Sequence, residues 1–272
     1  MNDNSLRISP FLRWPGGKRW LLKTLATKIN SDLIENYYEP FLGGGAIFFH
    51  FRFKKSYLTD VNYDLINAYI NVRDQHDKLI KKLKTMPNDR VSYNKFKAMN
   101  SSSNAVNAAR FLYLNRMAFS GMYRVNKMGI FNVPYGGDKS LDFFWSNDLL
   151  KNCSLALSSA TIECCDFSKM ISKAGVNDLV FCDPPYTVTH SNSGFKRYNE
   201  SIFSWQDQIR LRDEIFKAVD RGAEVILTNA ADQEIANLYH PFSPQILARH
   251  SDISRRGKSE GVFSEYIFYL KK

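Results

Sequence analysis

The residues with the clearest capacity for chemistry are Asp183-Pro184-Pro185-Tyr186, directly after the apolar run at 179–182. The run predicts a buried strand. Two successive prolines then fix the backbone and remove two N–H donors. Asp183 and the Pro184 carbonyl can accept both hydrogens of an exocyclic amino group, while Tyr186 stacks on the ring that carries it. A Pro-rich turn with a surface tyrosine is the alternative interpretation of these four residues alone.

A glycine-rich loop near the N-terminus predicts a second part of the site. Gly43-Gly44-Gly45 lies between a predicted strand at 37–41 and a predicted helix at 46–51, and glycines at such a turn let a ligand approach the backbone closely. The next predicted strand, 56–60, ends in Asp60, where an acid is placed to bond ribose hydroxyls. The loop does not end in Gly-Lys-Ser/Thr, which disfavours a nucleoside triphosphate.

The elements that position these residues alternate between strand and helix, which predicts an α/β fold. The predicted strands are 37–41, 56–60, 161–166, 178–183, 223–229, 245–250 and 262–270, and the further predicted helices are 19–29, 64–84, 204–220 and 233–239. Asp60, Asp166 and Asp183 each end a predicted strand. Ligands of open α/β sheets bind at the carboxyl ends of the strands, so the three acids are expected at one edge.

One segment interrupts the alternation. Between about 64 and 153 no apolar run predicts a buried strand. The segment is predicted to contain helices, one of them starting near the polar run 101–104, and then a hairpin of 122–125 and 130–133 around the turn 126–129. A helical lid is the alternative interpretation of this insertion.

Four motifs in the same order make the chain resemble the Dam-type (D12 class) DNA adenine-N6 methyltransferases over nearly its whole length. They are Trp14-Pro15-Gly16-Gly17-Lys18, residues 41–45, the stretch from Asn115 to Pro134, and residues 183–186. The resemblance implies a Rossmann-like methyltransferase sheet in a catalytic domain of residues 1–63 and 154–272. It also implies a mainly helical target-recognition domain at 64–153 that carries the β-hairpin.

The resemblance implies S-adenosyl-L-methionine as methyl donor, adenine N6 in double-stranded DNA as acceptor, and no metal. The implied cofactor-binding residues are Trp14, Lys18, Phe41, Gly43, Gly45, Asp60, Asp166, Phe167 and Asp183, and the implied catalytic residues are Asp183, Pro184, Pro185 and Tyr186. The expected reaction is direct in-line methyl transfer to a base flipped out of the duplex.

The resemblance assigns recognition of the DNA sequence to the hairpin. Arg124 matches the family's arginine that reads the guanine of 5′-GATC, and an arginine can bind guanine O6 and N7 in a bidentate pair. Phe119 is placed to fill the gap left by the flipped base. Ser120 and Met122 replace the family's usual Asn and Leu. The expected DNA-binding residues are Arg116, Phe119, Ser120, Met122, Arg124, Asn126, Asn132, Pro134, Arg256 and Lys258.

Composition agrees with a nucleic-acid partner. The net charge of +10 and the pI of about 9.3 favour a polyanion. No apolar run is long enough for a membrane span, and the polar N-terminus has no signal-peptide pattern. Cys153, Cys164, Cys165 and Cys182 lack metal-ligand spacing and are expected as core thiols in a reducing cytoplasm. The expected protein is a cytoplasmic monomer of a bacterium or phage-infected cell.

Two other functions fit parts of this pattern. A similar Pro-Pro-Tyr site could methylate RNA or a protein glutamine, but the N-terminal Gly-Gly-Lys motif and the hairpin disfavour both. A catalytically silent, sequence-specific DNA-binding protein is disfavoured by the intact residues 183–186. The sequence therefore predicts an adenine-specific DNA methyltransferase acting at GATC or a GATC-like site. A restriction-modification, phage or replication-linked role fits equally.

Overall fold

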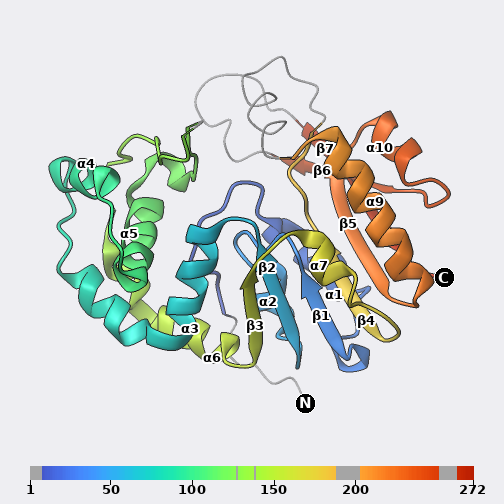
Figure 1. Cartoon of the computed structure of the whole chain (residues 1–272), viewed down its shortest axis with the longest axis horizontal. Coiled ribbons are helices and arrows are strands. Elements are labelled where there is room, and N and C mark those ends of the chain that lie inside the picture. Colours follow the sequence, from blue (N-terminus) through green and yellow to red (C-terminus); the bar gives the residue numbers. More distant parts are fainter. Residues whose placement is uncertain (1–7, 127, 138, 188–202, 251–261) are drawn as a thin grey trace. The chain divides into compact units, whose positions relative to one another are not determined.

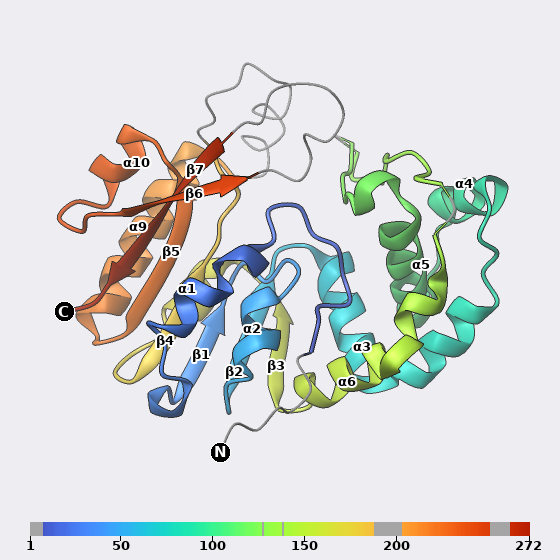
Figure 2. The same ribbon diagram turned by 180° about the vertical axis from the view of Figure 1, so that it is seen from behind.

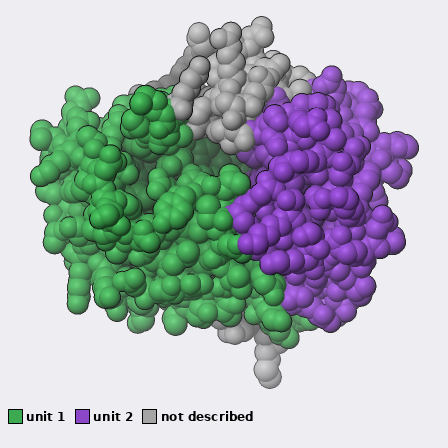
Figure 3. All heavy atoms as spheres, in the orientation of Figure 1, with its two compact units in different colours: residues 1–32, 42–164 green, residues 33–41, 165–272 purple. Residues whose placement is uncertain are grey.

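The computed structural model describes residues 8–126, 128–137, 139–187, 203–250 and 262–272. The chain divides into two compact units: Met1–Asp32 with Leu42–Cys164, and Leu33–Phe41 with Cys165–Lys272 (Figure 3). Seven strands form a sheet of order β3-β2-β1-β4-β5-β7-β6. The predicted α/β fold is confirmed, and each strand lies within two residues of its predicted ends.

The second unit contains a five-stranded part of the sheet. β1 (Asn36–Glu39), β4 (Asp178–Cys182) and β5 (Glu224–Ala230) are parallel, whereas β7 (Val262–Leu270) runs antiparallel to β5 and to β6 (Gln245–His250). Every residue of β4 is buried. This burial is expected of a central parallel strand.

The described residues of the second unit include the helices α7 (Phe167–Ile171), α9 (Trp205–Asp220) and α10 (Gln233–Leu238). α9 packs along β5, as Figures 1 and 2 show from opposite sides. It begins at a capping box in which the Ser204 hydroxyl and the Asp207 carboxylate bond each other's backbone N–H groups. This cap fixes the start of α9 close to its predicted position.

The first unit contains the parallel pair of β2 (Ser56–Asp60) and β3 (Ala160–Cys164). α2 (Ala46–Phe51) follows the glycine loop, as predicted. The predicted helix at 19–29 is wrong in extent, because a 3₁₀ turn (Lys18–Leu21) leads into a shorter α1 (Leu22–Ala26). A further 3₁₀ turn follows at Ser31–Leu33.

Helices fill the chain between β2 and β3, and no strand lies among the described residues of this stretch. The helices are α3 (Tyr63–Lys84), α4 (Arg90–Ala98), α5 (Asn104–Met117) and α6 (Leu149–Leu157), with 3₁₀ turns at Phe119–Gly121, Leu141–Phe144 and Ser146–Asp148. α3 packs against α5 and α6 (Figure 1). Ser103 caps α5 through its side chain, which confirms the helix start predicted at 101–104. None of the described helices is long and apolar enough to cross a membrane.

Candidate functional site

The glycine loop of the first unit is fastened to the end of β2. Leu42 N–H donates to the Thr59 carbonyl at 3.0 Å, and Gly43 N–H donates to the Asp60 carboxylate at 3.2 Å. The second Asp60 oxygen accepts from Asn62 N–H at 3.0 Å. The structure therefore brings together the loop and the acid that the sequence placed 17 residues apart.

Glycine is required at two places in this loop. Gly43 and Gly45 have φ angles of 46° and 64°. A Cβ atom on Gly43 would lie 2.7 Å from Trp14 Cδ1, and one on Gly45 would lie 2.8 Å from the Tyr69 hydroxyl. Both the left-handed backbone and the close neighbours exclude a side chain. The loop thus presents bare backbone, as a site for a closely approaching ligand needs.

Trp14 links the N-terminal motif to the glycine loop. Its indole lies against Gly43 and stacks on Tyr123, with ring centroids 5.2 Å apart and planes 21° apart. Lys18 is buried, and its ammonium group donates to the Gly16 carbonyl at 3.0 Å. The structure places Trp14 beside the predicted cofactor loop and gives Lys18 a local backbone contact.

Burial raises the pKa of the Asp60 carboxyl above its usual value, although the backbone N–H groups of Asn62 and Gly43 act in the opposite direction. The bond from Gly43 N–H occupies one acceptor position on Asp60 Oδ2, and the bond from Asn62 N–H occupies one on Oδ1. A carboxylate oxygen can accept more than one hydrogen bond, so Asp60 can also accept from ribose hydroxyls. This is the chemistry that the strand-end position predicted.

The motif at 183–186 lies in the second unit, directly after β4, and both Asp183 and Tyr186 are partly buried. Thr228 on β5 donates its hydroxyl hydrogen to Asp183 Oδ1 at 2.7 Å. The Tyr186 hydroxyl donates to Glu265 Oε2 on β7 at 2.8 Å. Thus side chains from β5 and β7 hold the carboxylate of Asp183 and the hydroxyl of Tyr186.

Sequence reasoning missed Thr228 and Glu265. Both lie inside predicted strands, and both are buried, with exposed fractions of 1% and 6%. A charged residue inside a strand of otherwise mainly apolar residues was the available signal at Glu265, because buried charges need partners.

Three phenylalanines of the second unit form an aromatic cluster. Phe41 and Phe167 are stacked with centroids 5.5 Å apart, and Phe203 packs edge-on against Phe41 at 5.7 Å. Phe41 is partly exposed, whereas Phe167 and Phe203 are buried. The predicted cofactor residues Phe41 and Phe167 are therefore in contact and offer an apolar ring face that suits a purine.

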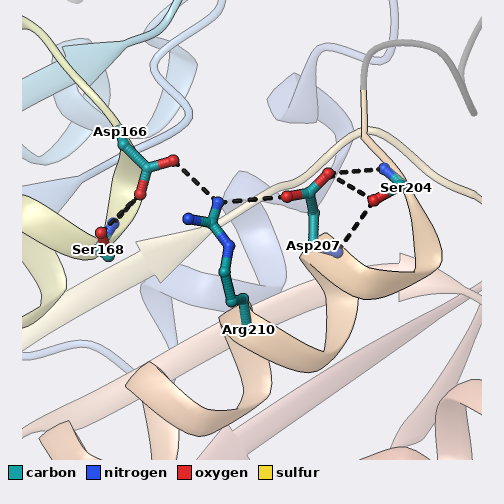
Figure 4. A network of polar contacts seen from close by, with 5 residues as sticks. All are labelled: Asp166, Ser168, Ser204, Asp207 and Arg210. Carbon is teal, nitrogen blue, oxygen red and sulfur yellow. Dashed lines mark hydrogen bonds and ion pairs between the residues drawn. The ribbon is translucent and has the colours of Figure 1, made fainter.

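The prediction that Asp166 ends a strand is wrong. β3 ends at Cys164, and Asp166 instead caps α7 by accepting from Ser168 N–H at 3.0 Å. Its second carboxylate oxygen accepts from Arg210 at 2.9 Å, and Arg210 also binds Asp207 at 3.2 Å (Figure 4). The Arg210 guanidinium lies 4.7 Å from the Phe167 ring centroid.

The pKa of Asp166 is lowered on balance. Partial burial raises it, but the bonds from Ser168 and the positive charge of Arg210 together outweigh that effect. Arg210 thus supports both predicted cofactor residues of this segment, Asp166 and Phe167. Nothing in the sequence pattern pointed to Arg210, which is one of two arginines on α9.

The predicted hairpin of 122–125 and 130–133 forms only in part: an isolated antiparallel bridge pairs Val125 with Phe131, and neither arm is a regular strand. Asn132 N–H donates to the Arg124 carbonyl at 3.0 Å. The exposed Arg124 side chain donates through Nε to Asn132 Oδ1 at 2.8 Å. The Asn126 side-chain oxygen accepts from the N–H groups of Met128 and Ile130. Asn126 therefore shapes the turn, and Asn132 orients Arg124.

The turn at Phe119–Gly121 is bonded to the end of the hairpin, because Phe119 N–H donates to the Pro134 carbonyl at 2.9 Å. Phe119 is 46% exposed. Ser120 has a φ of 54°, which is costly for serine and more readily adopted by asparagine. Met122 is partly exposed.

A cluster of positive charges lies beside this turn. Lys139 donates to the Ala118 carbonyl at 2.6 Å, and Arg13 lies against Gly121. Arg116 donates to the Ser140 carbonyl at 3.0 Å and covers the Phe143 ring. Burial is the largest effect that lowers the pKa of both Arg116 and Lys139, and the positive charge of Arg13 lowers it further. Arg116 was predicted from the sequence as a DNA-binding residue, whereas Arg13 and Lys139 were not among the predicted DNA-binding residues.

Two predicted DNA contacts, Arg256 and Lys258, lie outside the described residues. The expectation of four core thiols is wrong in part. Cys153 and Cys182 are buried, but Cys164 at the end of β3 is exposed and Cys165 is half-buried. Within the described ranges, no group of three His, Cys, Asp or Glu residues is arranged to hold a metal ion.

Taken separately, each unit contains residues that suit part of the nucleoside of S-adenosylmethionine in chemical type. Asp60 offers carboxylate acceptors beside bare backbone, and Asp166 offers a carboxylate beside the Phe41 and Phe167 rings. Ribose hydroxyls need acceptors and adenine needs an apolar face.

Comparisons with known proteins agree with these features. The family described as D12 class N6 adenine-specific DNA methyltransferase matches residues 14–250. The chain is 33% identical to the type II methyltransferase M1.LlaDCHI of Lactococcus lactis subsp. cremoris, over 98% of this chain and 97% of that protein. It is 32% identical to the type II methyltransferase M.MjaIII of Methanocaldococcus jannaschii, over 96% and 99%.

A third relative is the DNA adenine methylase of Vibrio cholerae, 30% identical over 94% of each chain. The family match covers the N-terminal motif, the glycine loop, the hairpin and residues 183–186. The chain therefore belongs to the D12 class of N6 adenine-specific DNA methyltransferases, and it is an enzyme that methylates adenine in DNA with S-adenosylmethionine as the donor implied by that family.

Proposed function

We propose that this enzyme methylates N6 of the adenine in 5′-GATC or a GATC-like site of duplex DNA, after flipping the base and by direct in-line transfer. The observation that supports the chemistry best is the anchored motif at 183–186. Thr228 holds Asp183 and Glu265 holds Tyr186, so that an acceptor and a stacking ring have fixed positions on one short loop.

The chemical difficulty is that the N6 lone pair of adenine is delocalised into the ring. Asp183 and the Pro184 carbonyl accept the two N6 hydrogens, which opposes that delocalisation and stabilises positive charge on nitrogen. When bound, S-adenosylmethionine supplies the methyl group, whose bond to sulfur breaks with both electrons going to sulfur while N6 forms the new bond. N6 then releases one proton to solvent, which restores the neutral amine.

Specificity is proposed to come from the hairpin and the adjoining turn. In this proposal Arg124 reads the guanine next to the target adenine, and the bond from its Nε to Asn132 limits the freedom of its side chain. Phe119 fills the space of the flipped base, and Pro134 lies along the groove. Arg116 with Arg13 and Lys139 supplies positive charge for phosphates.

The proposed function is tested by incubating the protein and S-adenosylmethionine with genomic DNA from a methylation-deficient host. N6-methyladenine is then mapped by single-molecule sequencing. We expect methylated adenines within GATC or a GATC-like site, and far fewer of them with the Asp183→Ala protein. Methylation at sites unrelated to GATC would contradict the proposed specificity, and preferential labelling of RNA would contradict duplex DNA as the substrate.

The proposed cofactor role of Asp166 leads to a prediction for Arg210. Arg210→Gln removes the ion pair with Asp166 and the cation above Phe167. Because the pair is half exposed, each contact contributes roughly 1 kcal/mol or less. S-adenosylmethionine affinity should therefore fall about 3- to 10-fold. Isothermal titration calorimetry with S-adenosylmethionine and S-adenosylhomocysteine measures this change.

Arg212 provides a matched control on the same helix. It also binds an aspartate, Asp213 at 2.7 Å, and lies 6.0 Å from the ring of Phe216. Arg212→Gln should leave the affinity for both ligands unchanged. Equal losses in the two variants would show that Arg210 acts only through the general stability of α9.

A further inference from the structure

Glu265 is a buried carboxylate at the hydroxyl end of Tyr186. It lies on β7, opposite Ala230 in the register of β5 with β7, and only 6% of it is exposed. Its Oε2 accepts the Tyr186 hydroxyl at 2.8 Å. A carboxylate in such surroundings is costly unless it is hydrogen-bonded, and the Tyr186 hydroxyl supplies one such bond.

A carboxylate acceptor alters a phenol in two ways. The charge-assisted hydrogen bond fixes the rotation of the ring about its attachment. It also draws the hydroxyl proton toward the carboxylate and adds electron density to the ring, which makes the ring face more attractive to positive charge. The low dielectric of a buried position strengthens both effects.

We propose that Glu265 is a positioning residue that orients Tyr186 and strengthens the attraction of its ring for the positive charge that N6 gains during methyl transfer. The inference rests on the proposed function, in which Tyr186 stacks on the target adenine. Positive charge develops in the transition state and spreads into that adenine. An electron-rich ring face therefore stabilises the transition state more than the neutral ground state.

The sheet register supports this role. Thr228 is paired with Ile267, and Ala230 with Glu265, in the antiparallel ladder of β5 and β7. The contact that holds Asp183 and the contact that holds Tyr186 therefore come from register positions two residues apart in one strand pair. This arrangement couples the position of the acceptor to the position of the stacking ring.

Glu265→Gln tests the proposal because glutamine has nearly the same size and keeps an oxygen that can accept the phenol hydrogen. The single-turnover rate of methyl transfer to a GATC oligonucleotide should fall about 3- to 30-fold. The dissociation constants for S-adenosylmethionine and for DNA should stay within about twofold. Glu224→Gln, at the opposite end of β5 and exposed, is the control and should match the wild type.

A double-mutant cycle with Tyr186→Phe separates this role from a structural one. If Glu265 acts through the Tyr186 hydroxyl, Glu265→Gln has no further effect on the rate in the Tyr186→Phe protein. Circular dichroism melting of all four proteins verifies that each is folded under the assay conditions.

Two results would overturn the inference while the wild type remains active. One is a Glu265→Gln rate within about twofold of wild type, and the other is an equal loss in the Tyr186→Phe background. A wild type that transfers no methyl group to adenine in duplex DNA would instead overturn the proposed function together with this inference.

Discussion

Replacing Asp183 with alanine should lower the single-turnover rate of methyl transfer by about 10²–10³-fold or more. The carboxylate is the proposed acceptor for one N6 hydrogen, and its loss removes stabilisation of the positive charge that forms on nitrogen. A lost contact to the cofactor would add to the effect. Transfer of a radiolabelled methyl group to a GATC oligonucleotide measures it.

The fold should survive this substitution, because Asp183 is only partly buried and lies on a loop after β4. Asp213→Ala, an exposed aspartate of α9, is the matched control and should keep full activity. Equal melting temperatures of the three proteins would exclude unfolding as the cause. Activity of Asp183→Ala within a few-fold of wild type would show that Asp183 is not the acceptor.

Replacing Arg124 with alanine should relax discrimination at the guanine of the site by about 1–3 kcal/mol. The reason is the loss of a bidentate pair to guanine O6 and N7, for which the arginine is already oriented by Asn132. Methylation rates are compared on oligonucleotides that differ only at this guanine. The mutant should lose activity on the GATC substrate and lose little on the others.

Arg90 is a suitable control, because it is an exposed arginine of the same unit at the start of α4. Arg90→Ala should leave the preference for guanine intact. If Arg124→Ala instead loses activity equally on every substrate, Arg124 binds the backbone and positions the DNA without reading it.

The strands were predictable because their signal is local. The run at 179–182 is apolar throughout and is buried throughout as β4. The missed helices α4, α6 and α7 have nine, nine and five residues, which is too short for a strong periodic pattern. Asp166 was misplaced for a related reason, since a residue two positions past a strand resembles a strand end in sequence while it caps the next helix.

The sequence also contained the parts of the site that need a particular residue type at a fixed short spacing. Gly43 and Gly45 are examples, because their backbone conformation and close neighbours exclude a side chain. The motif at 183–186 is another, since its prolines fix the backbone in which they lie. Such constraints depend on consecutive residues, so the sequence alone reveals them.

The tertiary structure alone decided which side chains support these motifs. Thr228 lies 45 residues from Asp183, Glu265 lies 79 residues from Tyr186, and Arg210 lies 44 residues from Asp166. Each pair meets because strand register or helix packing brings the two residues together, and those depend on the cooperative burial of the whole core. The sequence by itself therefore determined the family, the fold class and the candidate reacting groups, whereas the partners that orient those groups were fixed only when distant strands and helices packed together.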